Sequence, residues 1–532
     1  MAELSRRTFL ALGATIVVGA CSSDDSSSEP TEGATNPSTT SPPTTSAPTT
    51  GPPTTRPAAS SSSTTAAPTT TDVSLAENPF TLGVSSGDPD ETSAVLWTRL
   101  TGPDLPDAVD VTWELADDPS FATTSAGGTA TAESGDGHSV HAVVELDAPA
   151  WYRFTVGDWT SPVGRVAPAP AGAVDELRLA TASCQHWETG FYAAHRDIAE
   201  WAPDLVVFLG DFIYEGAGQP IAEGRVREHE GAEPTDLDGY RARYAQYLSD
   251  PELQAARGAA PWLVIWDDHE VENNYASLIP QDAADTPTFP DRRAAAYRAW
   301  WEHMPVRLPR PDGGDYPIYR ALRWGDLANL VLLDGRQYRS DQACGSPSLS
   351  LDPACPEAFD PARTMLGAAQ EEWLGAQFAE GTETWTVVAQ QTVLTDLRYG
   401  EAILNYDQWD GYTPARDRLL AQAATADRVV VLTGDIHLAG VGVLPGVGVE
   451  FVTSSISSTG LIDPALQPIL DTFDAVVASE LAHRGYTRHT VTPSTWTAEY
   501  RIVNDVIDPA SAVSTWSSFG VDAAARDTVV PA

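Results

Sequence analysis

Short runs in which apolar and polar residues alternate occupy the chain from about residue 78 to residue 157. Turns of Gly, Asp and Pro separate them, and no helical spacing is seen before about residue 188. The runs are FTLGVSSGDP, SAVLWTRL, VDVTWELA, HSVHAVVEL and WYRFTVG. A period of two is typical of strands with one buried face. We therefore predict a small all-β sandwich domain of the immunoglobulin or fibronectin type over residues 77–172.

From residue 173 the pattern changes, because longer apolar runs alternate with segments of helical spacing. The apolar runs predict strands at LRLATAS, LVVFLGD, PWLVIWDD, LANLVLLDGRQ, TWTVVAQQTVL and RVVVLTGDIHLAGVGVL. Helical spacing is present at 190–202, over 236–260 as a helical pair, and at 291–304. Strands that alternate with helices indicate an α/β fold, which we predict for residues 173–532. The last 25 or so residues are less patterned and are expected to wrap back on this fold.

The net charge of the chain limits the kinds of molecule that it is expected to bind. The 532 residues carry a formal net charge of −43, and all 31 basic residues are Arg. Such a surface argues against nucleic-acid binding, because a phosphate backbone needs basic patches, and no nucleic-acid partner is expected. If a substrate that bears phosphate binds here, a metal ion or a local Arg must reverse the sign of the field.

The opening stretch SRRTFLALGATIVVGAC resembles a twin-arginine export signal, because two Arg residues precede a short, mostly apolar run. The run is too short for a membrane span. Cys21 at its end resembles the lipidated Cys of a lipoprotein, and a plain cleaved signal with an incidental Cys is the alternative. Residues 1–21 are thus predicted to direct export through the twin-arginine machinery, and Cys21 to anchor the protein outside the cytoplasmic membrane. Residues 22–76 follow as a linker rich in Ser, Thr and Pro that cannot bury a core.

The other three cysteines differ in their surroundings. An exported protein can form disulfides. Cys344 and Cys355 lie close together in a loop-like stretch, QACGSPSLSLDPAC, and are predicted to pair. Cys184 is then left without a partner, and a lone Cys outside the cytosol requires another role.

Polar side chains that can bind metals follow four of the predicted strands. They are Cys184 after LATAS, Asp211 and Tyr214 around VVFLGD, Asp267, Asp268, His269 and Glu270 after LVIW, and Asp435 and His437 after VVVLTG. A single Asp at a strand end is typical of a helix cap or a turn. Ligands of α/β proteins, however, gather outside the carboxyl ends of strands. Four such clusters together predict one shared site.

The donor atoms of these clusters are a thiol, a phenol, carboxylates and imidazoles, which are all metal ligands. A carboxylate such as Asp211 can bridge two ions about 4 Å apart, and two such ions can clamp a phosphoryl group. A phenolate is a hard anionic ligand that favours a trivalent ion such as Fe³⁺, while the remaining Asp residues favour Ca²⁺. The expected cofactors are therefore Fe³⁺ and Ca²⁺.

Three motifs in this order, GD-x-x-Y, DDHE and GDIH, resemble the metallophosphoesterase signature, and the Tyr variant resembles the iron-binding version in purple acid phosphatases. Cys184, Asp268 and Asp435 replace an Asp, an Asn and a His of that signature. Together with GVSSGDPDETSAVLWTRL, ASCQ, DGRQYR and EFVTSSISS, the motifs resemble the PhoD-type alkaline phosphatases over about residues 78–504. The resemblance implies a four-layer catalytic domain, with two sheets flanked by helices, behind the small β domain.

The resemblance also implies the role of each ligand. For Fe³⁺ it implies Cys184, Asp211, Tyr214 and His437, with Asp211 as the bridge. For one or two Ca²⁺ ions it implies Asp268 and Asp435, with Asn273 completing the shell and Asn274 as the competing choice.

Two further residues are expected to act on the substrate. His269 resembles the His that contacts the phosphate or protonates the leaving group, and the alternative is a residue that orients a neighbouring ligand. Arg336 in LLDGRQYR could donate paired hydrogen bonds to a phosphate group, or it could form a structural salt bridge with Asp334 or Asp341.

The implied activity is that of an exported alkaline phosphatase that hydrolyses phosphate monoesters or diesters. In that chemistry a metal-bound hydroxide attacks phosphorus in line, so no Ser nucleophile is needed. One alternative is a phosphodiesterase or phospholipase D-like enzyme that acts on phospholipid or teichoic acid. Another is a non-catalytic surface lipoprotein whose β domain binds glycan or protein. Trp409 and Tyr412 either line the mouth of the site or pack in the core.

Overall fold

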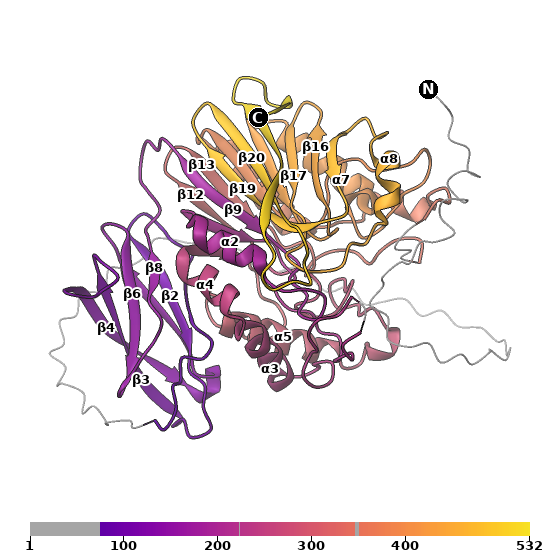
Figure 1. Cartoon of the computed structure of the whole chain (residues 1–532). Coiled ribbons are helices and arrows are strands. Elements are labelled where there is room, and N and C mark those ends of the chain that lie inside the picture. Colours follow the sequence, from indigo (N-terminus) through magenta and orange to yellow (C-terminus); the bar gives the residue numbers. More distant parts are fainter. Residues whose placement is uncertain (1–74, 223, 346–349) are drawn as a thin grey trace, which may run out of the picture. The chain divides into compact units, whose positions relative to one another are not determined.

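The computed structural model describes residues 75–222, 224–345 and 350–532 (Figure 1). The predicted export signal, the lipidation site Cys21 and nearly all of the predicted linker lie outside the described residues and stay predictions.

A search of the described ranges for a helix with both the length and the apolar character needed to cross a membrane finds none.

A ten-stranded sheet forms one layer, in the order β22-β21-β20-β19-β9-β10-β11-β1-β2-β5. Its strands are β1 (Val84–Gly87), β2 (Ser93–Arg99), β5 (Ser139–Glu145), β9 (Leu177–Ala182), β10 (Leu205–Phe208), β11 (Pro261–Val264), β19 (Arg484–Val491), β20 (Thr495–Val503), β21 (Val513–Asp522) and β22 (Val529–Pro531). Neighbours from β9 to β1 are parallel, as expected of an α/β fold. The end of the chain, in which the sequence shows little pattern, supplies the two edge strands β21 and β22.

A seven-stranded sheet forms the next layer, in the order β12-β13-β14-β15-β17-β16-β18. Its strands are β12 (Arg320–Trp324), β13 (Ala328–Leu332), β14 (Trp385–Ala389), β15 (Val429–Thr433), β16 (Ala439–Leu444), β17 (Gly448–Val452) and β18 (Val476–Glu480). The central neighbours β13, β14, β15 and β17 are parallel. Their apolar runs do not alternate with polar residues because both faces of these strands are buried.

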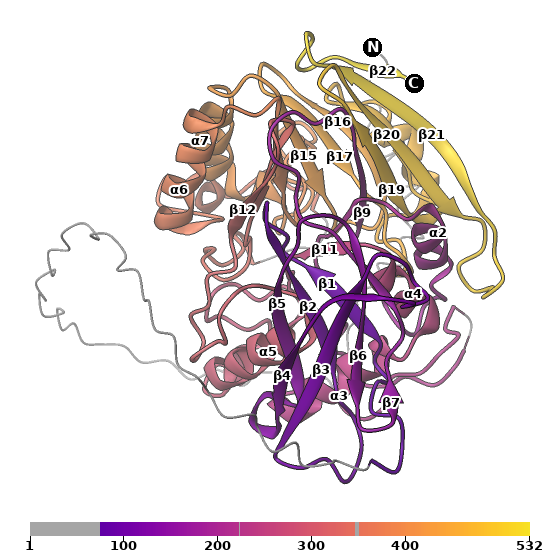
Figure 2. The same cartoon turned by 90° about the vertical axis from the view of Figure 1, so that its left-hand side faces the viewer.

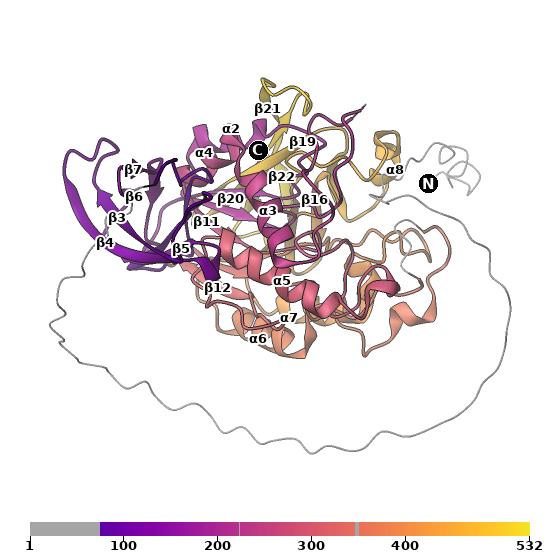
Figure 3. The same cartoon turned by 90° about the horizontal axis from the view of Figure 1, so that it is seen from below.

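Helices cover the two sheets on their outer faces (Figure 2). They are α2 (Ala193–Trp201), α3 (Leu237–Leu248), α4 (Pro251–Ala259) and α5 (Phe289–His303) beside the large sheet, α6 (Gly367–Glu380) and α7 (Thr413–Ala423) beside the small one, and the single turn α8 (Gln467–Leu470). Short 3₁₀ turns lie at η2 (Ser134–Asp136), η3 (Ala283–Asp285), η4 (Pro356–Phe359), η5 (Trp409–Tyr412) and η6 (Pro464–Leu466). Figure 3 shows α3 and α5 side by side, and the contacts between them agree.

The two faces of the small sheet bury different apolar clusters. In β13, Leu330 and Leu332 belong to the main core, which also contains side chains of the large sheet, whereas Val331 packs with α6 and α7. In β15, Val430 belongs to the main core and Val431 to the helical cluster. This alternation follows from the strand period of two. The catalytic region is therefore a four-layer arrangement of helices, sheet, sheet and helices, as the resemblance implies.

The N-terminal region is a small β domain with its own apolar core. Its remaining sheet has β4 (Thr124–Glu133), β3 (Ala108–Ala116), β6 (Ala150–Val156) and β7 (Trp159–Thr160) in that order, with β8 (Gly164–Val166) paired to β6. The apolar alternation does not predict β4, β7 or β8, and in β4 the reason is that TSAGGTATAE has no large apolar residue.

This small domain is joined to the catalytic region by backbone hydrogen bonds. Strand β1 pairs in parallel with β11, with Ser86 opposite Pro261 and Gly87 opposite Trp262. A Cβ atom at Gly87 would lie 2.3 Å from the Pro305 carbonyl oxygen and 2.5 Å from that of Trp262, so only Gly allows this close approach. The pattern predicts a separate sandwich, whereas the structure shows that β1, β2 and β5 extend the catalytic sheet.

The contact between β5 and α5 predicts a pH-dependent stability. The His141 Nε2 atom lies 3.1 Å from the Trp301 carbonyl oxygen and 3.0 Å from that of Met304, and the ring stacks on Trp301. Burial lowers the pKa of His141 to about 4, although Asp136 and Glu302 act to raise it. The unfolded chain therefore binds a proton more readily than the folded protein between pH 6.5 and pH 4. The stabilisation is complete above pH 6.5 and is lost as the pH falls toward 4.

His141→Phe should reduce this dependence. The variant is less stable at pH 7, because two carbonyl groups lose their donor. Between pH 7 and pH 5, the wild type should lose roughly 1–2 kcal/mol more of its unfolding free energy than the variant loses. Urea unfolding at the two pH values measures this difference. Equal pH dependence in both proteins would contradict the prediction.

Candidate metal centre

The four predicted clusters follow the carboxyl ends of β9, β10, β11 and β15. Cys184, Asp211, Asp435 and His437 have left-handed backbone conformations, with φ of 59°, 56°, 65° and 55°. Non-glycine residues in this region cost of order 1–3 kcal/mol each and gather at functional sites. Sharp turns directly after the strands therefore bring these side chains to one edge of the two sheets.

The loop after β10 approaches the loop after β11 closely at Gly210. A Cβ atom there would lie 2.6 Å from the backbone nitrogen of Asp267, and φ of Gly210 is 106°. Gly210 of the GD-x-x-Y motif is thus required for steric reasons. It allows Asp211 and Asp268 to meet, although 57 positions separate them in the sequence.

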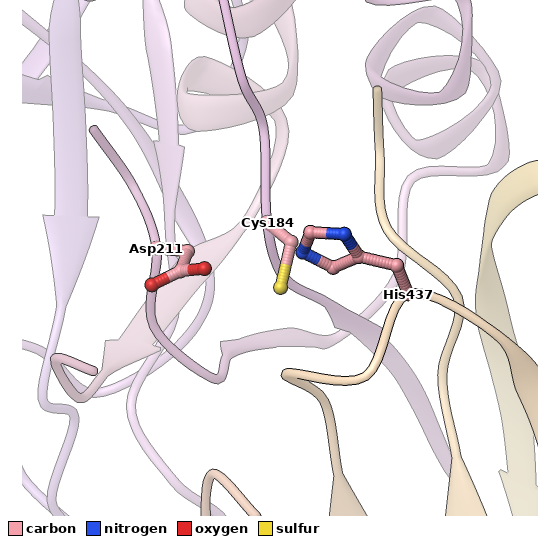
Figure 4. Close-up of side chains that lie close together, drawn as sticks. All are labelled: Cys184, Asp211 and His437. Atoms are coloured by element: carbon pink, nitrogen blue, oxygen red, sulfur yellow. The ribbon is translucent and has the colours of Figure 1, made fainter. Parts of the chain in front are cut away.

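Possible ligand atoms from these loops form three overlapping groups, each with its atoms within 4.8 Å of one another. The groups are Cys184, Asp211 and His437; Asp211, Asp268 and His269; and Asp267, Asp268 and Asp435. Figure 4 shows the first group, in which the thiol, the carboxylate and the imidazole come from three separate loops and converge. Asp211 and Asp268 each belong to two groups, so either carboxylate could be shared between neighbouring ions.

The phenol of Tyr214 reaches the first group. Its oxygen donates to Asp211 Oδ2 at 2.7 Å and lies 3.1 Å from His437 Nε2 and 2.8 Å from Ser458 Oγ. His437 Nδ1 donates to the Thr459 carbonyl oxygen at 2.6 Å, so in the neutral ring Nε2 has a free lone pair on the side of the phenol. The four predicted iron ligands therefore lie together.

Several carboxylate oxygens at the site are buried and have no hydrogen-bond partner among the described residues. They are Asp211 Oδ1, Asp267 Oδ2 and Asp268 Oδ1, the last of which lies 3.4 Å from Arg336 Nη2. Burial raises the pKa of the Asp211 carboxyl well above its usual range, and the neighbouring carboxylates raise it further. Burial likewise raises the pKa of Asp435 to about 7 and that of the Cys184 thiol well above its ordinary value. Buried oxygens that lack donors fit cations, which would favour the charged forms.

Arg336 lies among these carboxylates, and its side chain is 0% exposed. Its guanidinium is paired with Asp267, Asp268, Asp407 and Asp435. These partners differ from the predicted ones, since Asp334 instead accepts the backbone N–H of Arg336 at 3.0 Å. The side chain points into the acidic cluster, where its ion pairs are formed. A role of Arg336 in binding phosphate stays a prediction.

His269 is held by Glu215, a residue that sequence reasoning did not single out. The Nδ1 atom of His269 lies 2.6 Å from Glu215 Oε2, and the other carboxylate oxygen accepts the backbone N–H of Asn273 at 2.7 Å. Burial alone would raise the pKa of Glu215, but His269 and the hydrogen bonds lower it to about 2. The carboxylate therefore stays ionised and fixes the orientation of the His269 ring.

The two Asn residues reach the site through their backbone. The Asn273 side chain donates to Gln281 Oε1 at 2.7 Å. Asn274 donates its backbone N–H to Asp268 Oδ2 at 2.6 Å. The predicted role of Asn273 as a calcium ligand stays a prediction.

Glu270 joins the backbones of two site loops, a role that sequence reasoning did not assign. Its Oε2 accepts the backbone N–H groups of Asp211 at 3.0 Å and Asp267 at 2.7 Å, and its Oε1 accepts that of Phe212 at 2.5 Å. The side chain is buried. The position of Glu270 in DDHE marks it as polar and near the site, but its partners come from another loop.

The remaining predicted residues lie away from the ligand groups. Trp409 and Tyr412 are buried and pack with α6 and α7, which favours the packing role over a place at the mouth. Cys344 and Cys355 form a disulfide with Cα atoms 5.8 Å apart. Among the described residues, Cys184 is the free cysteine.

Comparisons with known proteins agree with this architecture. A family model described as PhoD-like phosphatase matches residues 179–500, and one described as its N-terminal domain matches residues 64–170. Alkaline phosphatase D of Bacillus subtilis (strain 168) is 41% identical over 478 residues, which cover 83% of this chain and 80% of that protein. A solved structure of PhoD has a TM-score of 0.81 and 40% identity, and covers 86% of this chain and 93% of its own. The motifs, the fold and these matches together show that the chain belongs to the PhoD-like phosphatase family.

Proposed function

We propose that this chain, a phosphoester hydrolase by its family, is an alkaline phosphatase with Fe³⁺ and Ca²⁺ in the metal centre. The observation that carries the proposal is the convergence of a buried thiol, a phenol, an imidazole and carboxylates with unpartnered oxygens. A chain with a net charge of −43 needs local positive charge to bind a phosphate ester, and metal ions at this cluster supply it.

The donor types divide the ligands between two kinds of ion. Cys184, Tyr214 and Asp211, with His437, offer several anionic donors, among them the hard phenolate oxygen, which suit a trivalent ion such as Fe³⁺. The third group consists of carboxylates alone, which suits Ca²⁺, and includes Asp268 and Asp435. Asp267, which sequence reasoning places in the cluster after LVIW without a ligand role, joins this group as a ligand candidate.

The chain's own residues then orient the substrate and move a proton. When bound, the ions neutralise the phosphate and supply a water of lowered pKa as the nucleophile. Burial alone would lower the pKa of His269, but Glu215 and the nearby Asp211 raise it well above 6.5. A protonated His269 held through Nδ1 carries a proton on Nε2, which it can give to the departing alcohol. Glu215 keeps the ring in that orientation throughout.

Metal analysis with a visible spectrum tests the proposal. We expect iron and calcium in the purified protein, with a phenolate-to-Fe³⁺ charge-transfer band that is lost in Tyr214→Phe, because this variant lacks the phenol oxygen. The variant should also release phosphate from chromogenic monoesters more slowly, by about tenfold or more, and diesters are assayed beside them. Tyr399→Phe, at a loop position outside the ligand groups, serves as the control. Stoichiometric Zn²⁺ without iron would overturn the metal assignment.

A further inference from the structure

The backbone of Tyr214 is held by side chains of α3 and not by a strand. The Tyr247 hydroxyl accepts the backbone N–H of Tyr214 at 3.1 Å. Arg243 Nη1 donates to the carbonyl oxygen of Tyr214 and, at 2.9 Å, to that of Gly216. Arg243 and Tyr247 are four positions apart and buried, so they lie on one face of the helix. Both polar groups of the Tyr214 backbone therefore end on α3.

The hydrogen bonds around Tyr247 have one consistent arrangement of protons. Its oxygen accepts the backbone N–H groups of Tyr214 and, at 3.1 Å, Trp187, which uses both lone pairs. Its own proton is then donated to His229 Nε2, 2.9 Å away. His229 Nδ1 lies 3.1 Å from the Gly216 carbonyl oxygen and 3.2 Å from Arg243 Nη1, so the ring also contacts the second α3 residue. The backbone N–H groups of Tyr214 and Trp187 and the Nε2 atom of His229 thus share the Tyr247 hydroxyl as their partner.

The ring of Tyr214 is also confined. Its centroid lies 4.5 Å from that of His186 and 4.1 Å from that of His269. The phenol oxygen lies 2.7 Å from Asp211 Oδ2 and 3.1 Å from His437 Nε2. Because the side chain has only two rotatable bonds, the place of its oxygen is set by the backbone that carries it.

We propose that Arg243 and Tyr247 are positioning residues that fix the Tyr214 phenol in the metal centre. The inference rests on the proposed function of Tyr214 as a metal ligand. Helix α3 is anchored for this task, because Asp236 caps its first turn by accepting the Gly239 backbone N–H at 2.8 Å. The two residues act through the backbone of Tyr214.

Tyr247→Phe tests this role, and Tyr244→Phe is a matched control. Tyr244 lies on the same helix, is equally buried, and its hydroxyl has no hydrogen-bond partner in the part of the chain that the structure describes. In metal-free protein we expect the Tyr214 amide to exchange its hydrogen about tenfold faster in Tyr247→Phe, since it loses its acceptor, and at the wild-type rate in Tyr244→Phe. A second variant, Arg243→Lys, removes the Nη1 group that donates to two carbonyl oxygens, and it should likewise speed exchange of the Tyr214 amide.

The metal-loaded enzyme provides the second readout. Tyr247→Phe should lower kcat by about tenfold with KM unchanged and shift the phenolate band, whereas Tyr244→Phe should leave both unchanged. The inference is overturned if Tyr247→Phe behaves like Tyr244→Phe in exchange and in kcat. If iron-loaded wild-type protein has no phenolate band, the proposed iron site fails, and the comparison of exchange rates alone decides whether α3 holds Tyr214.

Discussion

Asp211→Asn is expected to lower kcat/KM for phosphate ester hydrolysis by about three orders of magnitude. Asp211 contributes to two of the three possible ligand groups, so its loss weakens both sides of the proposed centre. Among the described residues, one oxygen of Asp211 has no hydrogen-bond partner, and the other accepts a hydrogen bond from the Tyr214 hydroxyl. The Asp211 carboxylate therefore lies where the first two ligand groups overlap. The Asn side chain keeps the shape but replaces one oxygen by a donor, which repels a cation.

Metal content and kcat/KM of the purified variant measure this effect. Asp427→Asn is the control, because it removes the same charge from an exposed side chain that pairs with Arg526 at 3.7 Å. The control should keep its iron, its calcium and its activity. An Asp211→Asn protein with full metal content and activity within tenfold of the wild type would contradict the shared role of this carboxylate.

The residues that converge at the candidate metal centre could be predicted from sequence because chemistry and position coincide. Cys184, Asp211 and Asp435 each directly follow an apolar run, and the carboxyl ends of parallel strands meet at one edge. No pairing between distant segments is needed for that inference. The four-layer catalytic fold was accessible for a similar reason, since alternating strands and helices allow few arrangements.

The contacts of the supporting residues could not be predicted, because their partners lie far away in the sequence. Glu215 contacts His269 across 54 positions, and Arg336 contacts Asp267 across 69. Strand β1 pairs with β11 across about 175 positions, so alternation alone does not show that the small domain extends the catalytic sheet. Each of these contacts depends on how distant segments meet in the folded protein, which the spacing of apolar residues along the chain does not show.

Glu270→Ala is expected to destabilise the protein by about 3 kcal/mol or more, because three buried N–H groups lose their acceptor. The groups belong to Asp211, Phe212 and Asp267, on two loops of the metal centre. Glu270→Gln should lose only about 1–2 kcal/mol, since it keeps one acceptor oxygen. The loss of unfolding free energy should therefore increase with the number of acceptor oxygens removed.

Chemical denaturation of the metal-free variants measures this series, so that weaker metal binding does not enter the free energy of unfolding. Glu114→Ala is the control, because its partly exposed carboxylate pairs with Arg153 at 2.7 Å and such a pair is worth only about 0–1 kcal/mol. Equal losses for Glu270→Ala and Glu114→Ala would show that the three N–H groups find other acceptors. The graded loss would instead show that one carboxylate joins the loops of Asp211 and Asp267. The two loops would then be held in place before any ion binds.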